Sequence, residues 1–202
     1  MTAVRLLNRQ SGEIVEAELV VDPSQAVVVD TELRWQHFRD LAEERLLREG
    51  IPIPESQSWD WENKFTTADR NSVRFFAIDR LGRIEGLMML AISPRVSRAR
   101  NAADDKVLYV EFLEAAPWNL PGYVGEKAEF KGIGITLLAC AVGVSMETGC
   151  KGMIGLHSLP QAEAFYLHLG FDDLGLDDSE GCHYFFELSQ EPAANALKGD
   201  WQ

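Results

Sequence analysis

Residues 131–146, KGIGITLLACAVGVSM, decide the fold of this chain. Two glycines remove side chains where the backbone enters a segment that is apolar on nearly every side, and such a segment predicts a buried helix over residues 135–146. Residues 107–115, which precede this loop, are rich in Val, Leu, Tyr and Phe, as is typical of a strand. The chain therefore passes from a strand through a glycine loop into a buried helix.

Gly132 and Gly134 point to a phosphate-binding loop. The first backbone N–H groups of a helix have no internal acceptor, and the helix dipole adds positive potential, so the two together form a seat for phosphate oxygens. Glycine is needed there because it lets a phosphate approach the backbone closely. The alternative is that both glycines only permit a tight turn or close helix packing, and the motif alone favours neither interpretation.

The remaining elements follow from turn residues and hydrophobic periodicity. We expect a hairpin around Gln10-Ser11-Gly12, a helix from the cap Asp30 to Gly50, and a short helix capped by Ser58. Strands are expected at residues 72–79, 84–93, 107–115, 153–156, 171–174 and 183–188, with helices at 135–146 and 160–169. This order predicts a mixed α/β fold in which one sheet is buried between helices.

Composition sets limits on the function. The chain has 202 residues, of which 46% are hydrophobic, so disorder of the whole chain is excluded. We expect one domain over residues 1–188, with a hairpin extension at 1–29 and a loosely ordered tail at 189–202. No apolar run approaches the roughly 20 residues of a membrane-spanning helix, and residues 1–10 lack a secretion signal, so we expect a cytoplasmic protein with no membrane association.

Charge and cysteine usage argue against nucleic-acid binding, disulfide frameworks and metal sites. The net charge is -13, and such a chain repels nucleic acid unless its few cations gather in one place. Arg95, Arg98 and Arg100 form the one compact basic group and are expected to be a solvated loop. The 3 cysteines are an odd number without a Cys-x-x-Cys pair, so neither a disulfide framework nor a metal site is expected.

Three stretches together resemble the GNAT superfamily of acetyl-CoA-dependent N-acyltransferases. They are LEAAP at 113–117, GIG at 132–134 and FYLHLGF at 165–171. The stretches LEAAPWN at 113–119 and LHSLP at 156–160 are similar to a bacterial branch of that superfamily. The resemblance implies a GNAT-like, mostly antiparallel sheet of about seven strands flanked by about four helices, with the fourth and fifth strands splayed apart.

The resemblance also implies where acetyl-CoA, the co-substrate, would lie. Its pantetheine would pair with the fourth strand, and its diphosphate would rest on the glycine loop. The residues implied are Leu113, Ala115, Phe130, Lys131, Gly132, Ile133, Gly134, Ile135 and Ser158. Two positions depart from the family pattern. Glu129 replaces the usual Gln or Arg, flanked by Lys127 and Lys131, and Leu159 replaces an Asn, with Ser158 and Gln161 as the nearest polar substitutes.

Catalytic residues are expected on three elements. Tyr166 matches the family tyrosine that protonates the departing thiolate, a task for which a phenol is suited because it is protonated at neutral pH. The alternative is a core aromatic residue. The amine must lose a proton before it attacks, and Glu111, Glu114, His157 and water are the candidate acceptors, with Glu111 preferred.

The acceptor side is expected near four further residues. Trp59 and Trp61 flank Asp60 and would wall a pocket for a cationic amine, although tryptophans so placed are more often part of a core. Trp118 and Asn119 follow the fourth strand and would border the same site.

The sequence thus predicts an N-acetyltransferase that acts by direct attack of a primary amine of a small molecule or protein on acetyl-CoA. The alternative is a non-catalytic module of the same fold that binds CoA or a protein. A third hypothesis, an acyltransferase that acts on charged tRNA, is disfavoured by the acidic charge. A homodimer is compatible with the resemblance.

Overall fold

The computed structural model describes residues 2–99, 104–178, 181 and 183–197, so Arg100, Cys182 and the last five residues lie outside the described part. The chain divides into two compact units. The first unit comprises Met1–Asn71, Phe75–Met88 and Leu113–Leu137, and the second comprises Ser72–Arg74, Met89–Phe112 and Leu138–Gln202.

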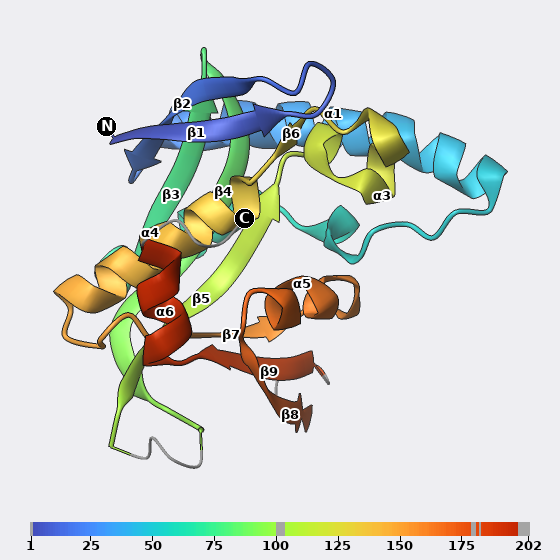
Figure 1. Cartoon of the computed structure of the whole chain (residues 1–202). Coiled ribbons are helices and arrows are strands. Elements are labelled where there is room, and N and C mark those ends of the chain that lie inside the picture. The colour runs from blue at the N-terminus through green and yellow to red at the C-terminus, as the bar shows by residue number, and fades with distance from the viewer. Residues whose placement is uncertain (1, 100–103, 179–180, 182, 198–202) are drawn as a thin grey trace. The chain divides into compact units, whose positions relative to one another are not determined.

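Most elements belong to one unit, and four run through both. Figure 1 labels most of the helices and strands. The first unit holds β1 (Thr2–Asn8), β2 (Ile14–Val21), α1 (Gln25–Glu49), α2 (Trp61–Thr67), α3 (Pro121–Val124) and β6 (Phe130–Lys131). The second unit holds β7 (Ile154–Ser158), α5 (Glu163–His168), β8 (Asp172–Asp177), β9 (His183–Leu188) and α6 (Gln190–Leu197). The shared elements are β3 (Val73–Arg80), β4 (Arg83–Val96), β5 (Lys106–Ala115) and α4 (Ile133–Glu147).

Hydrogen bonding orders the strands as β6-β1-β2-β3-β4-β5 in the first unit and β4-β5-β7-β9-β8 in the second. The pairs β1–β2, β1–β6, β2–β3, β7–β9 and β8–β9 are antiparallel, and β5–β7 is parallel. The mixed, mostly antiparallel class expected from the sequence is therefore confirmed. The described residues form nine strands and six α-helices rather than about seven and about four, because β6, α3 and α6 are short elements of two, four and eight residues.

In the first unit the N-terminal hairpin is confirmed, and both predicted helix caps were wrong. The turn places Gly12 at φ +72, where its N–H donates to the carbonyl of Asn8. Helix α1 begins earlier than expected because Ser24 accepts from the N–H of Val27, while Asp30 lies inside the helix and pairs with Arg34. Helix α2 is capped by Asp60, not Ser58.

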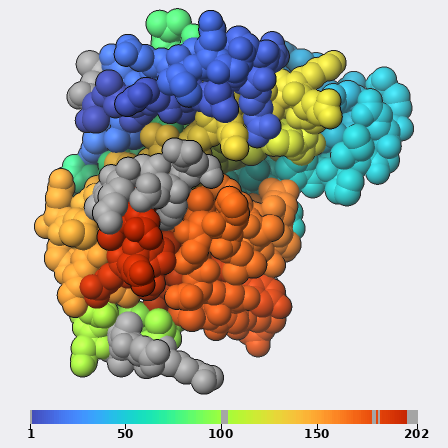
Figure 2. All heavy atoms as spheres, in the orientation of Figure 1, coloured from blue at the N-terminus to red at the C-terminus, as the bar shows by residue number. Residues whose placement is uncertain are grey.

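In the second unit, the segment expected to be a loosely ordered tail begins with helix α6. Ala193 and Ala196 of this helix are buried, because their three-residue spacing puts both methyl groups on one face. Figure 2 shows α5 in orange and α6 in red side by side, and a Cβ at Gly170 would lie 3.4 Å from the Cβ of Pro192. Within the described ranges no helix has the length and apolar character needed to span a bilayer.

Candidate active site

The glycine loop of the first unit presents unpaired amides. Gly132 lies at φ +99 with open space around it, so the backbone conformation rather than crowding requires glycine. Thr136 is the first residue of α4 whose N–H donates to a backbone carbonyl, that of Gly132, at 2.9 Å. In the described part of the chain no acceptor meets the N–H groups of residues 133–135. Unpaired N–H groups at a helix start are the feature on which the predicted anion seat depends.

Trp118 and Asn119, which were expected to border the acceptor, are held against buried Glu85. The indole N–H of Trp118 and the side-chain amide of Asn119 both donate to Oε2 of Glu85 at 2.8 Å. Oδ1 of Asn119 in turn accepts from the N–H of Phe130 at 2.9 Å. Asn119, at 4% exposure, therefore positions the glycine loop.

A glycine that sequence reasoning missed also places the loop. A Cβ at Gly86 on β4 would lie 2.3 Å from Cγ2 of Ile133 and 3.2 Å from Cδ1 of Leu137. The first turn of α4 consequently reaches the strand only because residue 86 has no side chain. No local signal marks this glycine, because its neighbours come from a distant segment.

Glu129, the departure from the family pattern, is compensated. Arg83 donates to both of its carboxylate oxygens and, through Nε, to Oε1 of Glu85 at 2.7 Å. Two carboxylates hold this guanidinium, and together they raise the pKa of Arg83 although its burial opposes them. The carboxylate of Glu129 is therefore one half of an ion pair.

Glu114 and Trp61 belong to a buried polar cluster in the first unit. The fully buried Arg39 donates to both oxygens of Glu114, at 3.0 and 2.9 Å, and to Oε1 of Glu32 at 3.2 Å. The indole of Trp61 donates to Glu114 at 2.7 Å, and burial raises the pKa of that carboxyl. Trp61 has no exposed surface, so it supports the cluster from within.

Trp59 differs from Trp61 because it is only half-buried. Lys64 places its ammonium 5.3 Å from the ring centroid, so the face of Trp59 already attracts a cation. Burial lowers the pKa of this lysine, while the carboxylates of Glu114, Asp60 and Glu32 raise it.

In the second unit the parallel ladder between β5 and β7 is short. It joins Leu108 to Ile154, Tyr109 to Gly155 and Val110 to Leu156, and both strands continue beyond it. Glu111 and His157 are the first residues past its end. Glu111 pairs with Arg95 at 2.6 Å, and the two ring nitrogens of His157 lie 2.6 Å from the hydroxyl of Tyr109 and 3.1 Å from Asp177. The hydroxyl of Ser158 donates to the carbonyl of Leu159.

Tyr166 lies on α5 among aromatic rings. Its ring centroid is 5.4 Å from that of Phe171 and 6.0 Å from that of Phe186, and only 7% of the residue is exposed. Burial raises the pKa of the phenol, so it keeps its proton at neutral pH. The turn after the helix has Gly170 at φ +85, which lets the N–H of Phe171 reach the carbonyl of Tyr166.

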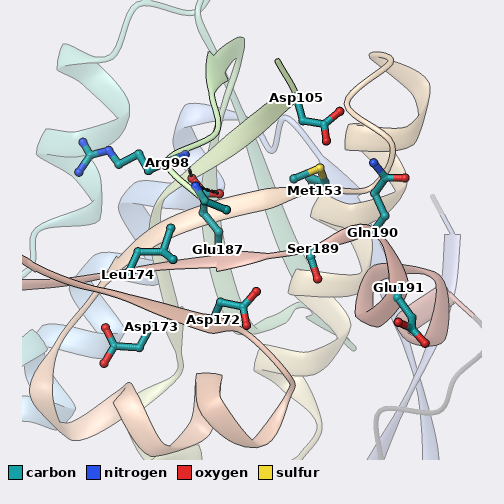
Figure 3. A pocket seen from close by; sticks show the side chains of 11 residues that line it. Arg98, Asp105, Met153, Asp172, Asp173, Leu174, Glu187, Ser189, Gln190 and Glu191 are labelled. Atoms are coloured by element: carbon teal, nitrogen blue, oxygen red, sulfur yellow. Dashed lines mark hydrogen bonds between the residues drawn. The ribbon is translucent and has the colours of Figure 1, made fainter. Parts of the chain in front are cut away.

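A cavity of about 840 Å³ lies in the second unit and contains none of the predicted site residues (Figure 3). Its charged lining residues are Arg98, Asp105, Asp172, Asp173, Glu187 and Glu191. Asp105 pairs with Lys151, and Glu187 accepts from Ser97 and from the N–H of Arg98. A smaller hollow of about 120 Å³ in the first unit is lined by Trp35, Arg83 and Trp118, among others.

Comparison with known proteins identifies the fold. No protein-family model matches the chain, and no curated protein sequence matches it. Aminoglycoside acetyltransferase AAC(6')-Ib, solved with coenzyme A and kanamycin, is similar with a TM-score of 0.54 and 12% identity over 88% of this chain and 98% of that one.

Two other solved structures are also similar to this chain. FeeM, an N-acyl amino acid synthase from uncultured soil microbes, has a TM-score of 0.53 and 14% identity over 92% of this chain and 98% of its own. A protein from Desulfovibrio desulfuricans that is assigned to the GNAT acetyltransferase family has a TM-score of 0.51 and 13% identity. The match covers 86% of this chain and 99% of that one. The chain therefore has the GNAT fold, which confirms the resemblance at the level of the fold.

Proposed function

We propose that this chain, which has the GNAT fold, is an N-acyltransferase that moves an acetyl group from acetyl-CoA to a primary amine. The observation that carries the proposal is the row of unpaired amides at residues 133–135, at the start of a helix long enough to have a strong dipole. A diphosphate is the group that such a seat accommodates. The supporting contacts from Asn119 and Glu85 hold the loop in place for it.

The remaining cofactor roles follow the resemblance. The loop from Phe130 to Ile135, with Lys131 on its surface, would hold the diphosphate. Leu113 and Ala115 on β5 would lie along the pantetheine. The thioester supplies an activated acetyl carbonyl, and the residues of this chain orient it and exclude water.

Direct attack by the amine is proposed because neither described cysteine is suited to carry the acetyl group as a nucleophile. Cys140 is half-buried in α4, and burial raises the pKa of its thiol to about 12, so it carries no thiolate at neutral pH. Cys150 is buried, and Cys182 lies outside the described residues. Tyr166 would protonate the departing thiolate, because burial keeps its phenol protonated.

A cationic amine, on a small molecule or a protein, is the acceptor class that charge favours. The net charge of -13 steers cations toward the chain. Arg95 and Arg98 are neutralised by Glu111 and Asp177, which supports the expectation that nucleic acid is not a partner.

A non-catalytic CoA-binding module is the second candidate. Both carboxylates expected as bases are already paired, Glu111 with Arg95 and Glu114 with Arg39. An enzyme would therefore need a different proton acceptor for its amine substrate. A module that only binds CoA would need no proton acceptor.

The test has two stages. Thermal shift and calorimetry with acetyl-CoA measure binding, and thiol release with spermidine, kanamycin and a lysine peptide, read with mass spectrometry, measures transfer. Binding with transfer supports the enzyme, and binding without transfer favours the module. A chain that neither binds acetyl-CoA nor transfers contradicts the proposed function.

A further inference from the structure

Three polar side chains from three strands of the second unit form a continuous chain of contacts. The hydroxyl of Tyr109 on β5 lies 2.6 Å from Nδ1 of His157 on β7, and Nε2 of His157 lies 3.1 Å from Oδ2 of Asp177 on β8. His157 and Asp177 have side-chain exposures of 7% and 14%, and Tyr109 is buried. Polar groups withdrawn from water to this degree are costly unless each is hydrogen-bonded, and here each is.

The chemistry of the groups assigns the protons along this chain. An ionised carboxylate can only accept, so Nε2 of the imidazole carries the hydrogen that meets Asp177. In the neutral imidazole Nδ1 is then an acceptor, and the hydroxyl of Tyr109 donates to it. When His157 is protonated the direction of this hydrogen bond reverses, so one proton can move between the phenol and the imidazole.

The surroundings hold the three groups in place and balance their charge. Arg98 pairs with Asp177, and Arg95 lies 3.9 Å from the ring centroid of Tyr109 while it pairs with Glu111. Each guanidinium is thus paired with a carboxylate, so neither presents an uncompensated positive charge to an ammonium. The ring of Phe185 lies 4.8 Å from the imidazole and restricts its rotation.

The position of the chain in the sheet connects it with the proposed function. Tyr109 belongs to the last but one pair of the β5–β7 ladder, and His157 follows the last pair. These side chains therefore stand where the two strands stop pairing, which is where the GNAT resemblance places the pantetheine. Because strand side chains alternate, Tyr109 and Glu111 share a face.

We propose that Tyr109, His157 and Asp177 are the proton relay of the acyl transfer, an inference that rests on the proposed function. An N–H bond of the acceptor ammonium breaks as an O–H bond forms on Tyr109, and the former phenol proton passes to Nδ1 of His157. The positive charge moves from the ammonium to the imidazolium, which Asp177 stabilises. Tyr109 is the catalytic residue, and His157 and Asp177 act through it.

The pH dependence of acyl transfer through the relay is set by the charged groups around it. Those that face the relay are Arg95 and Arg98 from β4 and the loop after it, Glu111 beside Tyr109 on β5, Asp177 on β8, and Glu187 on β9. Glu187 is bound by Ser97 and by the amides of Arg98 and Ala99, so its charge is already satisfied.

The first measurement is nitrogen NMR of the imidazole rings, because 4 histidines can be assigned by single substitutions. The relay requires neutral His157 to carry its proton on Nε2, and requires Tyr109→Phe to change the pH at which the ring titrates. A neutral ring protonated on Nδ1, or a titration that Tyr109→Phe leaves unmoved, overturns the relay whether or not the chain turns over.

The second measurement compares two acceptors with acetyl-CoA. Spermidine must lose a proton before it attacks, whereas hydroxylamine is already neutral at pH 7. Tyr109→Phe should lower transfer to spermidine roughly 100-fold at unchanged KM for acetyl-CoA and change transfer to hydroxylamine little. Asp177→Asn should act in the same direction, and Tyr184→Phe, on neighbouring β9, is the control expected to have no effect.

The outcomes separate the two proposals. A wild-type chain that transfers to spermidine, with Tyr109→Phe equally active, overturns the relay alone. An equal loss with both acceptors also overturns it, because the defect is then not in deprotonation. A wild-type chain that neither binds acetyl-CoA nor transfers an acetyl group overturns the proposed function and the relay together.

Discussion

Arg83 donates to both carboxylate oxygens of Glu129 at the foot of the glycine loop. The sequence alone makes Glu129 a carboxylate beside a proposed diphosphate seat, which Coulomb repulsion would disfavour. The ion pair removes that objection, because the guanidinium lies in the same unit and balances the charge. Lys127 and Lys131, which flank Glu129 in the sequence, are exposed, and Arg83 supplies the charge that balances it.

Removing Arg83 should therefore weaken acetyl-CoA binding. Arg83→Ala leaves Glu129 uncompensated, and for a partly exposed pair we expect a cost of about 1 kcal/mol, or roughly fivefold in Kd by calorimetry. Arg83→Ala with Glu129→Gln should regain most of the affinity. Arg70→Ala breaks the pair with Asp22 in the same unit and serves as the control. An Arg83→Ala chain that binds as tightly as wild type would contradict this role.

Gly134→Asp should abolish the anion seat. The new carboxylate would occupy the space above the amides and repel the diphosphate, so acetyl-CoA should bind at least about tenfold more weakly, which is about 1.4 kcal/mol. Gly143→Asp adds the same charge farther along α4, at a residue with nothing near its Cβ, and should bind normally. Equal affinities of the two variants would show that the diphosphate lies elsewhere.

Gly86→Ala should destabilise the first unit and displace the start of α4. Its Cβ would lie 2.3 Å from Cγ2 of Ile133, a distance that forces movement. Overpacking of this kind costs about 1–3 kcal/mol, which calorimetric melting would detect. Gly143→Ala, with open space at its Cβ, should be neutral or stabilising. If both variants melt at the wild-type temperature, the close approach of Ile133 is not needed for stability.

Much of the loop and little of its support could be predicted from the sequence. Gly132, Gly170 and the helix that follows residue 132 are local features. A glycine at a turn signals a positive φ, and an apolar run signals a buried helix, so a few neighbouring residues suffice to predict each. The caps at Ser24 and Asp60 were missed because several polar residues compete at each start and only the folded backbone selects one.

The polar clusters could not be predicted because they are tertiary. Arg39 and Glu114 are 75 residues apart, and Tyr109 and His157 are 48 apart, so no periodicity links either pair. Glu114 was expected as a candidate base because it lies on the strand of residues 107–115, and its pairing with Arg39 becomes apparent only in the folded chain. The same limit explains why the hydrogen bond from the N–H of Phe130 to Asn119 could not be predicted.

Tyr166→Phe should lower turnover and spare binding. The ring would keep its contacts with Phe171 and Phe186, but no proton would be available for the thiolate, so kcat should fall roughly 100-fold with little change in Kd for acetyl-CoA. Because burial raises the pKa of this phenol, the proposed activity of the wild-type chain should not fall through ionisation of Tyr166 up to about pH 9. Unchanged kcat in the variant would remove Tyr166 from the mechanism.

The most direct test of the diphosphate seat is an amide NMR titration of the full chain with two acyl donors. Acetyl-CoA carries the diphosphate, and S-acetylpantetheine carries the same thioester without it. The seat at residues 133–135 predicts that these amide resonances shift with acetyl-CoA and remain in place with S-acetylpantetheine. Resonances that stay unmoved by acetyl-CoA, while other residues report its binding, would contradict the account.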